Sequence, residues 1–494
     1  MLSVLAVLSL FGLAACTPLD DYVNAPDPNF GWTDLGMTIK GLGWTGHIVN
    51  MTSQAWLTAD DWMFQNGAPG PIWWHYMLIV IPERLVPEYS DHGFLWITGG
   101  SNDAGSLPNV SKQDARRFTG VVGAALYQIP NEKIYFLAEQ PPVARLGRCV
   151  YPASGEDALI AYAWNHFIND PTDPTWLPRL PMTKAAMRGM DTLAEFIGNA
   201  TGAVVDKFMI AGASKRGWTT WTTAAVDPRV VAAMPLVMDE LDFIPNIHHH
   251  YRAYCGWSFA LEDYYVMNFT REIDSPGVAA MMEIIDPLVY APRLTMPKLV
   301  VDAGGDEFFL PDDNLFWWNN MTDPKHLLMV ANAEHSLATG IVSILDAGES
   351  SGAFFGGFLA KAPIPVFNWK IDPVTGDITV TNPTSQAPPT RVEMWYAFSA
   401  KGTGRRDFRL VAGPNPHFQP VLWLPMELQA QIDGNTWVAN TPATPDGRWV
   451  AFFVTVMYKG VGKLEYQFTT QVSIWPQTFP CQDCYGAGCY GSLV

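Results

Sequence analysis

Residues 207–221 read KFMIAGASKRGWTTW, and this stretch decides the fold that we expect. An apolar run ends at Gly212, Ser214 follows after one small residue, and Gly217 precedes a helical pattern. A turn of this kind between a strand and a helix is typical of a nucleophile elbow, which exposes a serine hydroxyl at the end of a strand. The common pattern is G-x-S-x-G, whereas the second glycine here lies one place later. The stretch therefore predicts Ser214 as a nucleophile.

Strands and helices alternate on both sides of this turn. Continuous apolar runs bounded by turn residues predict strands buried on both faces, and longer periodic runs predict helices. Thr183 is expected to cap the N-terminus of one helix. The alternation implies a doubly wound, mostly parallel sheet. The predicted strands are 47–56, 74–81, 93–98, 124–129, 207–211, 231–238, 298–303 and 326–331, and the predicted helices are 157–168, 183–199 and one from the serine turn to 225.

Changes in composition predict how the chain is organised. It begins with an apolar run ending in small residues, which is typical of a signal peptide. Polar residues punctuated by Pro and Gly at 17–41 predict an extended segment. Short alternating strands near the C-terminus predict a β-sandwich. The expected segments are a signal peptide at 1–16, an α/β domain at 17–362 with an aromatic-rich cap insertion at about 239–295, a β-sandwich-like domain at 363–476 and a Cys-rich tail at 477–494.

A serine hydroxyl needs a base that accepts its proton, and the base needs an acid that orients it. In the α/β-hydrolase fold these partners follow the serine in the order acid then histidine, each on a loop after a strand. Asp306 follows the predicted strand 298–303, and His335 follows the predicted strand 326–331. We therefore expect Ser214, Asp306 and His335 to form a catalytic triad.

A second carboxylate competes with Asp306 for the role of the acid. Asp239 follows the predicted strand 231–238, and some proteins of this fold place the acid one strand earlier. Asp239 therefore stays open as the alternative acid. Glu307 and Glu334 lie on the same loops as Asp306 and His335, and we expect both to be solvated charges.

An acyl-transfer site also needs N–H donors for the oxyanion of its tetrahedral intermediate. The backbone N–H of the residue after the nucleophile, Lys215, is the first expected donor. A loop after an earlier strand supplies the second, and Gly99-Gly100-Ser101-Asn102 follows the predicted strand 93–98. We expect Gly100 or Ser101 to donate there.

Two cations stand directly after the nucleophile. Lys215 and Arg216 could stabilise the oxyanion, bind a substrate carboxylate or pair with an acidic neighbour, and pairing is favoured for Arg216. Trp218, beside the elbow, and Trp257, in the insertion, are the aromatic side chains expected at the substrate together with Arg216. The substrate class that fits such a site is a small ester or a peptide.

Charge and histidine content exclude several partners. The net charge is −18, from 30 basic and 48 acidic residues, which argues against nucleic acid and anionic membrane surfaces. No later stretch approaches the ~20 apolar residues of a membrane span. The consecutive histidines 248–250 point in different directions on one element, so they do not predict a metal site. We expect neither a metal nor another cofactor.

The N-terminus fits two routes of export. Residues 13–16, Leu-Ala-Ala-Cys, match a bacterial lipoprotein box in which Cys16 would carry a lipid anchor. Asn-x-Ser/Thr sequons instead favour a glycosylated eukaryotic secreted protein. Either route predicts an extracellular protein, in which the terminal cysteines favour disulfides over a metal, with their pairing open. The sequons lie at Asn50, Asn109, Asn199, Asn268 and Asn320, and the terminal cysteines are Cys481, Cys484 and Cys489.

Several motifs resemble one known family. They are LDDYV at 19–23 with PDP at 26–28, GASKRGWTTW at 212–221, DEFF at 306–309 and NAEH at 332–335. Together they resemble the PhoPQ-activated pathogenicity-related family, which also contains secreted autocrine proliferation repressors. The resemblance implies an α/β-hydrolase core with a C-terminal β domain and a role in growth-repressing signalling.

Two functions therefore stay open. The first is a secreted serine hydrolase, either an esterase or a peptidase of the dipeptidyl or prolyl kind, and it rests on the ordered triad. The second is an extracellular autocrine signalling protein that represses cell proliferation through a cell-surface receptor, and it rests on the family resemblance.

Overall fold

The structure is a computed structural model that describes residues 16–61, 70–102, 120–132, 134, 136, 155–338 and 341–494. The predicted signal peptide lies outside the described residues except for Cys16, which is exposed. The sequon at Asn109 and the cysteine at Cys149 also lie outside them. No helix within the described ranges is long and apolar enough to cross a membrane.

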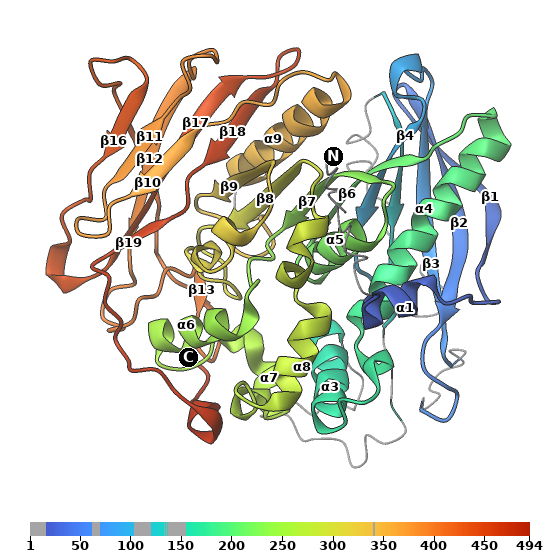
Figure 1. Cartoon of the computed structure of the whole chain (residues 1–494), viewed down its shortest axis with the longest axis horizontal. Helices are drawn as coiled ribbons and strands as arrows, with labels where there is room; N and C mark the ends of the chain where they lie inside the picture. Colours follow the sequence, from blue (N-terminus) through green and yellow to red (C-terminus); the bar gives the residue numbers. More distant parts are fainter. Residues whose placement is uncertain are drawn as a thin grey trace, which may run out of the picture.

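A nine-stranded sheet forms the centre of the molecule, in the order β1-β2-β3-β5-β4-β6-β7-β8-β9 (Figure 1). The strands from β5 to β9 are parallel to one another, whereas β1, β2 and β3 pair antiparallel, as does β3 with β5. The strands are β1 Gly31–Gly41, β2 Trp44–Ala55, β3 Ile72–Pro82, β4 His92–Ile97, β5 Val122–Leu126, β6 Lys207–Ala213, β7 Val230–Leu236, β8 Lys298–Ala303 and β9 Lys325–Val330.

The sequence located these strands but not all of their directions. The strands expected at 47–56 and 74–81 exist as β2 and β3, yet they join the sheet antiparallel. A continuous apolar run indicates burial on both faces and carries no information about direction. The segment 17–41 was expected to be extended throughout, but it contains the helix α1 (Pro18–Asn24) as well as β1.

Helices cover both faces of the sheet. Alternate residues of β4 show this directly, because Leu95 packs in the buried cluster that contains Leu193 of α4, and Phe94 packs against Phe355 of α9. Such alternation follows from the two-residue period of a strand. The helices on the first face are α3 (Glu156–Asn169), α4 (Arg179–Thr201) and α5 (Lys215–Val226), and α9 (Ile341–Leu359) lies on the second. This mostly parallel sheet, covered on both faces, is an α/β-hydrolase fold.

The expected N-cap at Thr183 is wrong. Helix α4 begins at Arg179, and Thr183 lies inside it with its hydroxyl donating to the carbonyl of Arg179 at 2.7 Å. Pro181 falls in the first turn of α4, where a helix tolerates a residue without an N–H. Because proline is rare inside a helix, the sequence pattern placed the start of this helix after Pro181.

The segment between β7 and β8 is helical where a cap was expected. Its helices α6 (Phe243–Tyr254), α7 (Glu262–Val266) and α8 (Pro276–Ile285) gather with α3 at the lower edge of the molecule (Figure 1). Short 3-10 turns connect them. Of these helices, α6 and α7 supply one side of the pocket described below.

Antiparallel strands follow α9 and lie beside β9 at one end of the central sheet (Figure 1). Ile378 and Val454 from two of these sheets share one buried cluster with Phe354 of α9, so this region and the α/β region share a core. The boundary at 363 therefore stays a prediction. The main strands are β10 Asn368–Ile371, β11 Ile378–Thr381, β12 Arg391–Phe398, β15 Leu424–Glu427, β16 Thr436–Ala439, β17 Val450–Lys459, β18 Glu465–Thr469 and β19 Ser473–Trp475, with the short pair β13 Val411–Ala412 and β14 His417–Phe418.

Two disulfides hold the C-terminal tail against the α6–α8 region. Cys255, at the end of α6, is bonded to Cys481, and Cys484 is bonded to Cys489. The backbone of Trp257 exchanges hydrogen bonds with Ser492 and Val494 at 2.9 and 2.8 Å. The tail therefore backs the loop that carries Trp257.

Candidate active site

Ser214 lies on the turn between β6 and α5. Its backbone has φ +58° and ψ −123°, a conformation that residues with a side chain rarely adopt. Its N–H donates to the carbonyl of Leu236 on β7 at 2.8 Å. A Cβ at Gly212 would lie 2.6 Å from the carbonyl oxygen of Arg216, and one at Gly217 would lie 2.8 Å from that of Leu236. The displaced second glycine is therefore required by the close approach of α5 to β7.

The three residues of the expected triad lie in one hydrogen-bonded chain. Nε2 of His335 is 2.7 Å from Oγ of Ser214. Nδ1 of His335 is 2.8 and 3.0 Å from the two carboxylate oxygens of Asp306. Asp306 and His335 follow β8 and β9, which run parallel to β6, so all three side chains come from the same edge of the sheet, at the carboxyl ends of its strands.

Backbone and ring contacts hold the histidine in place. The N–H of His335 donates to Oε2 of Glu307 at 3.1 Å, and the ring of Phe308 lies 4.4 Å from the imidazole. Asp306 is buried and also accepts the N–H of Phe308 at 2.7 Å. Glu307 was expected to be a solvated loop charge, and this is wrong. Burial raises its pKa, and its carboxylate contacts the backbone of His335.

Asp239, the alternative acid, points elsewhere. It is buried, and its carboxylate accepts the indole N–H of Trp317 at 2.7 Å and the amide of Asn314 at 3.3 Å. Burial raises its pKa well above the usual range, and the nearby Asp302 and Asp313 raise it further. Within the described residues its carboxylate contacts no imidazole, so the structure places Asp306, and not Asp239, on His335.

Lys215 and Arg216 are both paired with acids at the start of α3. Nζ of Lys215 lies 3.0 Å from Asp157 and 3.6 Å from Glu156. Arg216 forms an ion pair with Glu156 and donates from Nε to the carbonyl of Ile129 at 2.5 Å. The expectation that Arg216 pairs with an acid fits this geometry, whereas its expected contact with substrate is not supported, because Arg216 is not among the residues that line the pocket described below.

The loop after β4 packs on Arg216. A Cβ at Gly99 would overlap the guanidinium of Arg216, so a side chain there would displace the ion pair of Arg216 with Glu156. Gly100 adopts φ +128°, which also favours glycine. The carbonyl of Gly99 accepts the N–H of Gln128 at 3.1 Å, and Asn102 donates to the carbonyl of Glu132 at 2.6 Å. The predicted donors Gly100 and Ser101 thus lie on a loop that is anchored beside the elbow.

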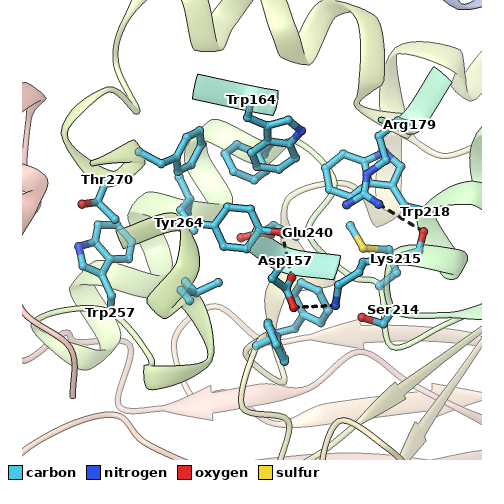
Figure 2. Close-up of a pocket in the computed structure, with 17 residues that line it drawn as sticks. Asp157, Trp164, Arg179, Ser214, Lys215, Trp218, Glu240, Trp257, Tyr264 and Thr270 are labelled. Atoms are coloured by element: carbon cyan, nitrogen blue, oxygen red, sulfur yellow. Dashed lines mark hydrogen bonds and ion pairs between the residues drawn. The ribbon is translucent and has the colours of Figure 1, made fainter. Parts of the chain in front are cut away.

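Beside Ser214 and Lys215 opens a pocket of about 600 Å³, counting the solvent at its mouth (Figure 2). Its walls are mainly aromatic, and Trp218 and Trp257 are both among them, as expected. Four charged side chains also line it, Asp157, Arg179, Lys215 and Glu240, and the sequence had not singled out Asp157, Arg179 or Glu240. The aromatic lining residues are Trp164, Trp218, Phe243, Trp257, Tyr264, Phe269, Phe308 and Phe309.

Comparisons with known proteins place the chain in a family. A profile of the PhoPQ-activated pathogenicity-related protein family matches residues 19–409. The chain belongs to this family. It is 38% identical over 500 residues to autocrine proliferation repressor protein A of Dictyostelium discoideum, which covers 98% of this chain and 95% of that relative. The matched region contains Ser214, Asp306 and His335.

Solved structures align more distantly. The acetyl xylan esterase from Paenibacillus sp. R4 shares 15% identity with a TM-score of 0.43, over 70% of this chain and 92% of that one. The glucuronoyl esterase from Solibacter usitatus shares 13% identity with a TM-score of 0.37, over 66% of this chain and 86% of that one.

In this member of the PhoPQ-activated family, the three consecutive histidines have separate partners. His248 contacts Asp274 at 3.0 Å and Asp483 at 2.8 Å, and His250 accepts the N–H of Ser258 at 3.1 Å. His249 contacts Asp312 at 3.1 Å, beside the guanidinium of Arg406. The guanidinium of Arg406 already supplies the positive charge beside His249 and Asp312. Cys484 and Cys489, which lie near His248, form a disulfide.

Proposed function

We propose that the protein is a serine hydrolase in which Ser214, His335 and Asp306 form the catalytic triad. The observation that carries the proposal is the 2.7 Å contact between Ser214 Oγ and His335 Nε2, on an elbow with a positive φ. Asp306 on Nδ1 favours the tautomer that leaves the lone pair of Nε2 facing the hydroxyl. His335 can then accept the proton as the serine attacks.

The reaction proceeds in two halves. Ser214 Oγ bonds to the acyl carbon while its proton moves to Nε2 of His335, and the leaving group departs with that proton as its bond to carbon breaks. A water then attacks the acyl-enzyme through the same base, and Ser214 leaves with a proton. The backbone N–H of Lys215, at the first position of α5, and a donor from Gly100 or Ser101 stabilise the oxyanion in both halves.

Both esters and peptides fit this chemistry. The aromatic walls of the pocket suit a small ester or the end of a peptide with an apolar body, and Ser214 lines the same pocket. No metal or cofactor takes part in the proposed steps.

A fluorophosphonate probe tests the proposal, because it phosphonylates only an activated serine. We expect the folded protein to be labelled and Ser214→Ala to lose the label. Ser275, which caps α8, provides the matched control, and Ser275→Ala should be labelled like the wild type. Absence of labelling in the folded wild type, or labelling that survives Ser214→Ala, would contradict the proposal.

A second function is favoured by the 38% identity to an autocrine proliferation repressor over almost the whole chain. We propose that the protein is secreted and represses proliferation through a cell-surface receptor, with or without catalysis. Growth assays with added wild type and Ser214→Ala separate these cases. Equal repression by both would make the chemistry dispensable, and no repression by either would remove this candidate.

Secretion and glycosylation belong to the same proposal. Asn199, Asn268 and Asn320 are exposed and accessible to a glycan, whereas the Oδ1 atom of Asn50 is buried within β2. Expression in a eukaryotic host should deliver the protein to the medium, with a mass that falls on treatment with a glycosidase. Retention inside the cell without a glycan would contradict this part of the proposal.

A further inference from the structure

The guanidinium of Arg179 is buried and forms no ion pair with the residues that the structure describes. The side chain is 2% exposed, and its Nε has no hydrogen-bond partner among those residues. Nη1 makes only long contacts, 3.5 Å to the carbonyl of Lys215 and 3.6 Å to the sulfur of Met182. No carboxylate in the described part of the chain lies within ion-pair distance of it. Burying a charge without a partner is costly, so this arginine calls for an explanation.

Other buried arginines of the chain have the carboxylate partner that Arg179 lacks among the described residues. Arg406 and Arg409 are 5% and 1% exposed, and their Nη2 atoms lie 2.6 Å from Asp312 and Asp407, respectively. Arg216 is paired with Glu156. Each of these cations has a carboxylate from the protein itself, whereas Arg179 has none among the described residues.

The acids nearest to Arg179 do not serve as its ion-pair partner. Both oxygens of Asp157 are engaged, one by the hydroxyl of Tyr264 at 3.0 Å and the other by Lys215 at 3.0 Å. Glu240 faces the same pocket but makes no ion pair with Arg179 (Figure 2). Burial raises the pKa of Glu240 to about 8, so near neutral pH this side chain is largely uncharged.

The pocket positions Arg179 close to the nucleophile. The guanidinium stacks 4.3 Å from the ring of Trp218 in the first turns of α5, and it contacts the carbonyl of the residue that follows Ser214. Stacking fixes the plane of the guanidinium, and Figure 2 shows Arg179 beside Trp218 among the residues that line the pocket. A planar guanidinium held in this way presents paired N–H donors that match the two oxygens of a carboxylate.

We propose that Arg179 binds a carboxylate on the substrate, so that the enzyme selects esters or amides that carry an acidic group. The statement about substrates rests on the proposed serine hydrolase, whereas the binding of the carboxylate does not. The neutral acid of Glu240 can donate a second hydrogen bond to the same anion. A cationic ligand is disfavoured, because Arg179 lines the pocket, whereas the charge of Lys215 is already balanced by Asp157 and Glu156.

The binding experiment uses the full chain carrying Ser214→Ala, so that no turnover occurs. Calorimetry measures the Kd of 3-phenylpropionate and of 3-phenylpropanamide, which differ only in the charged group. We expect the acid to bind about ten- to hundredfold more tightly, as charge-assisted hydrogen bonds do. Adding Arg179→Gln should abolish the difference, and Arg179→Lys should retain part of it. Equal affinities, or a preference for the acid that survives Arg179→Gln, would overturn the proposal.

The turnover experiment compares 4-nitrophenyl hydrogen adipate with its methyl ester. The ratio of their kcat/KM values should favour the acid in the wild type and fall at least about tenfold in Arg179→Gln. An unchanged ratio would overturn the proposal. If neither ester is hydrolysed and Ser214 is not labelled by a fluorophosphonate, the proposed function fails while the binding experiment still decides the role of Arg179.

Thermal melting separates a binding role from a structural one. Arg179→Met removes a buried charge that has no carboxylate partner in the described part of the chain, so the melting temperature should stay equal or rise. Arg409→Met leaves Asp407 buried and unpaired and should melt several degrees lower. A loss of stability in Arg179→Met as large as in Arg409→Met would assign Arg179 to the fold and overturn the proposal.

Discussion

Both carboxylate oxygens of Asp306 lie within hydrogen-bond distance of Nδ1 of His335, at 3.0 and 2.8 Å. Replacing the carboxylate by an amide allows the side chain to donate to Nδ1, which favours the wrong tautomer of the imidazole. We therefore expect Asp306→Asn to lower kcat by roughly ten-thousandfold, as measured with a 4-nitrophenyl ester, without unfolding the protein.

Asp239→Asn is the matched control, because Asp239 was the competing acid and is bonded to Trp317. Its amide can still accept from the indole through its oxygen, so kcat should stay within about tenfold of the wild type. The assignment of the acid would be reversed if Asp239→Asn lost more activity than Asp306→Asn.

The ion pair between Glu156 and Arg216 lies under the loop that carries Gly100. The two side chains are 19% and 11% exposed. Breaking a buried pair by removing one partner typically costs about 3–5 kcal/mol, and water at the edge of this pair should bring the cost to the lower end. We expect Glu156→Gln to lower the free energy of unfolding by about 3 kcal/mol in urea titrations.

The surface pair of Lys207 with Asp206 provides the comparison for this change. Its atoms are 3.7 Å apart, and the side chains are 43% and 61% exposed. Asp206→Asn should change the free energy of unfolding by no more than about 1 kcal/mol. If Glu156→Gln were as mild as Asp206→Asn, the pair would not support the elbow and its loop.

The elements that the sequence located best are those buried on both faces. The strand predicted at 298–303 coincides with β8, because six consecutive buried residues leave a continuous apolar run. The polar strand β1 was missed because most of its side chains are exposed and only its backbone pairs with β2. Helix α9 contains Gly348, Gly352 and Gly356, which weaken helix propensity, so packing of residues such as Phe354 decides its conformation.

The residues of the candidate site also differ in whether the sequence alone could predict them. Ser214, Asp306 and His335 could be predicted because each follows a recognisable strand in an order that the fold imposes. Glu156, Arg179 and Glu240 could not be, because their roles depend on which helices the fold brings together over the elbow. No local pattern distinguishes the buried Arg179 on α4 from an arginine on an exposed helix face. Only the contacts across the pocket reveal that Arg179 is buried beside the nucleophile.

Glu240 makes the stability of the protein depend on pH. Burial raises its pKa from 4.5 to about 8, an effect that Asp286 reinforces and Arg179 opposes. Between pH 4.5 and pH 8 the folded chain keeps a proton on Glu240 that the unfolded chain has released. The stabilisation that this group contributes is therefore complete below about pH 4.5 and is lost as the pH rises through 8. We expect the free energy of unfolding to fall between pH 5 and pH 8.

Glu240→Gln isolates this contribution, since an amide does not titrate. The fall in unfolding free energy between pH 5 and pH 8 should be smaller in Glu240→Gln than in the wild type by at least about 1 kcal/mol, because one pKa unit corresponds to about 1.4 kcal/mol. Glu283→Gln, at an exposed position on α8, gives the background effect of removing one acid. Identical pH profiles for Glu240→Gln and the wild type would contradict the expected shift.

The two disulfides should contribute unequally to stability. Cys255–Cys481 closes a loop of 226 residues, whereas Cys484–Cys489 spans only 5. In the chain-entropy model a longer loop restricts the unfolded chain more, so losing the first disulfide should cost about 5 kcal/mol and losing the second about 2 kcal/mol. The double variant Cys255→Ser/Cys481→Ser should therefore melt at a lower temperature than Cys484→Ser/Cys489→Ser. Release of the tail should also loosen the loop of Trp257 and raise KM for esters. Equal melting temperatures for the two double variants would show that tail packing, and not the long tether, provides the stabilisation.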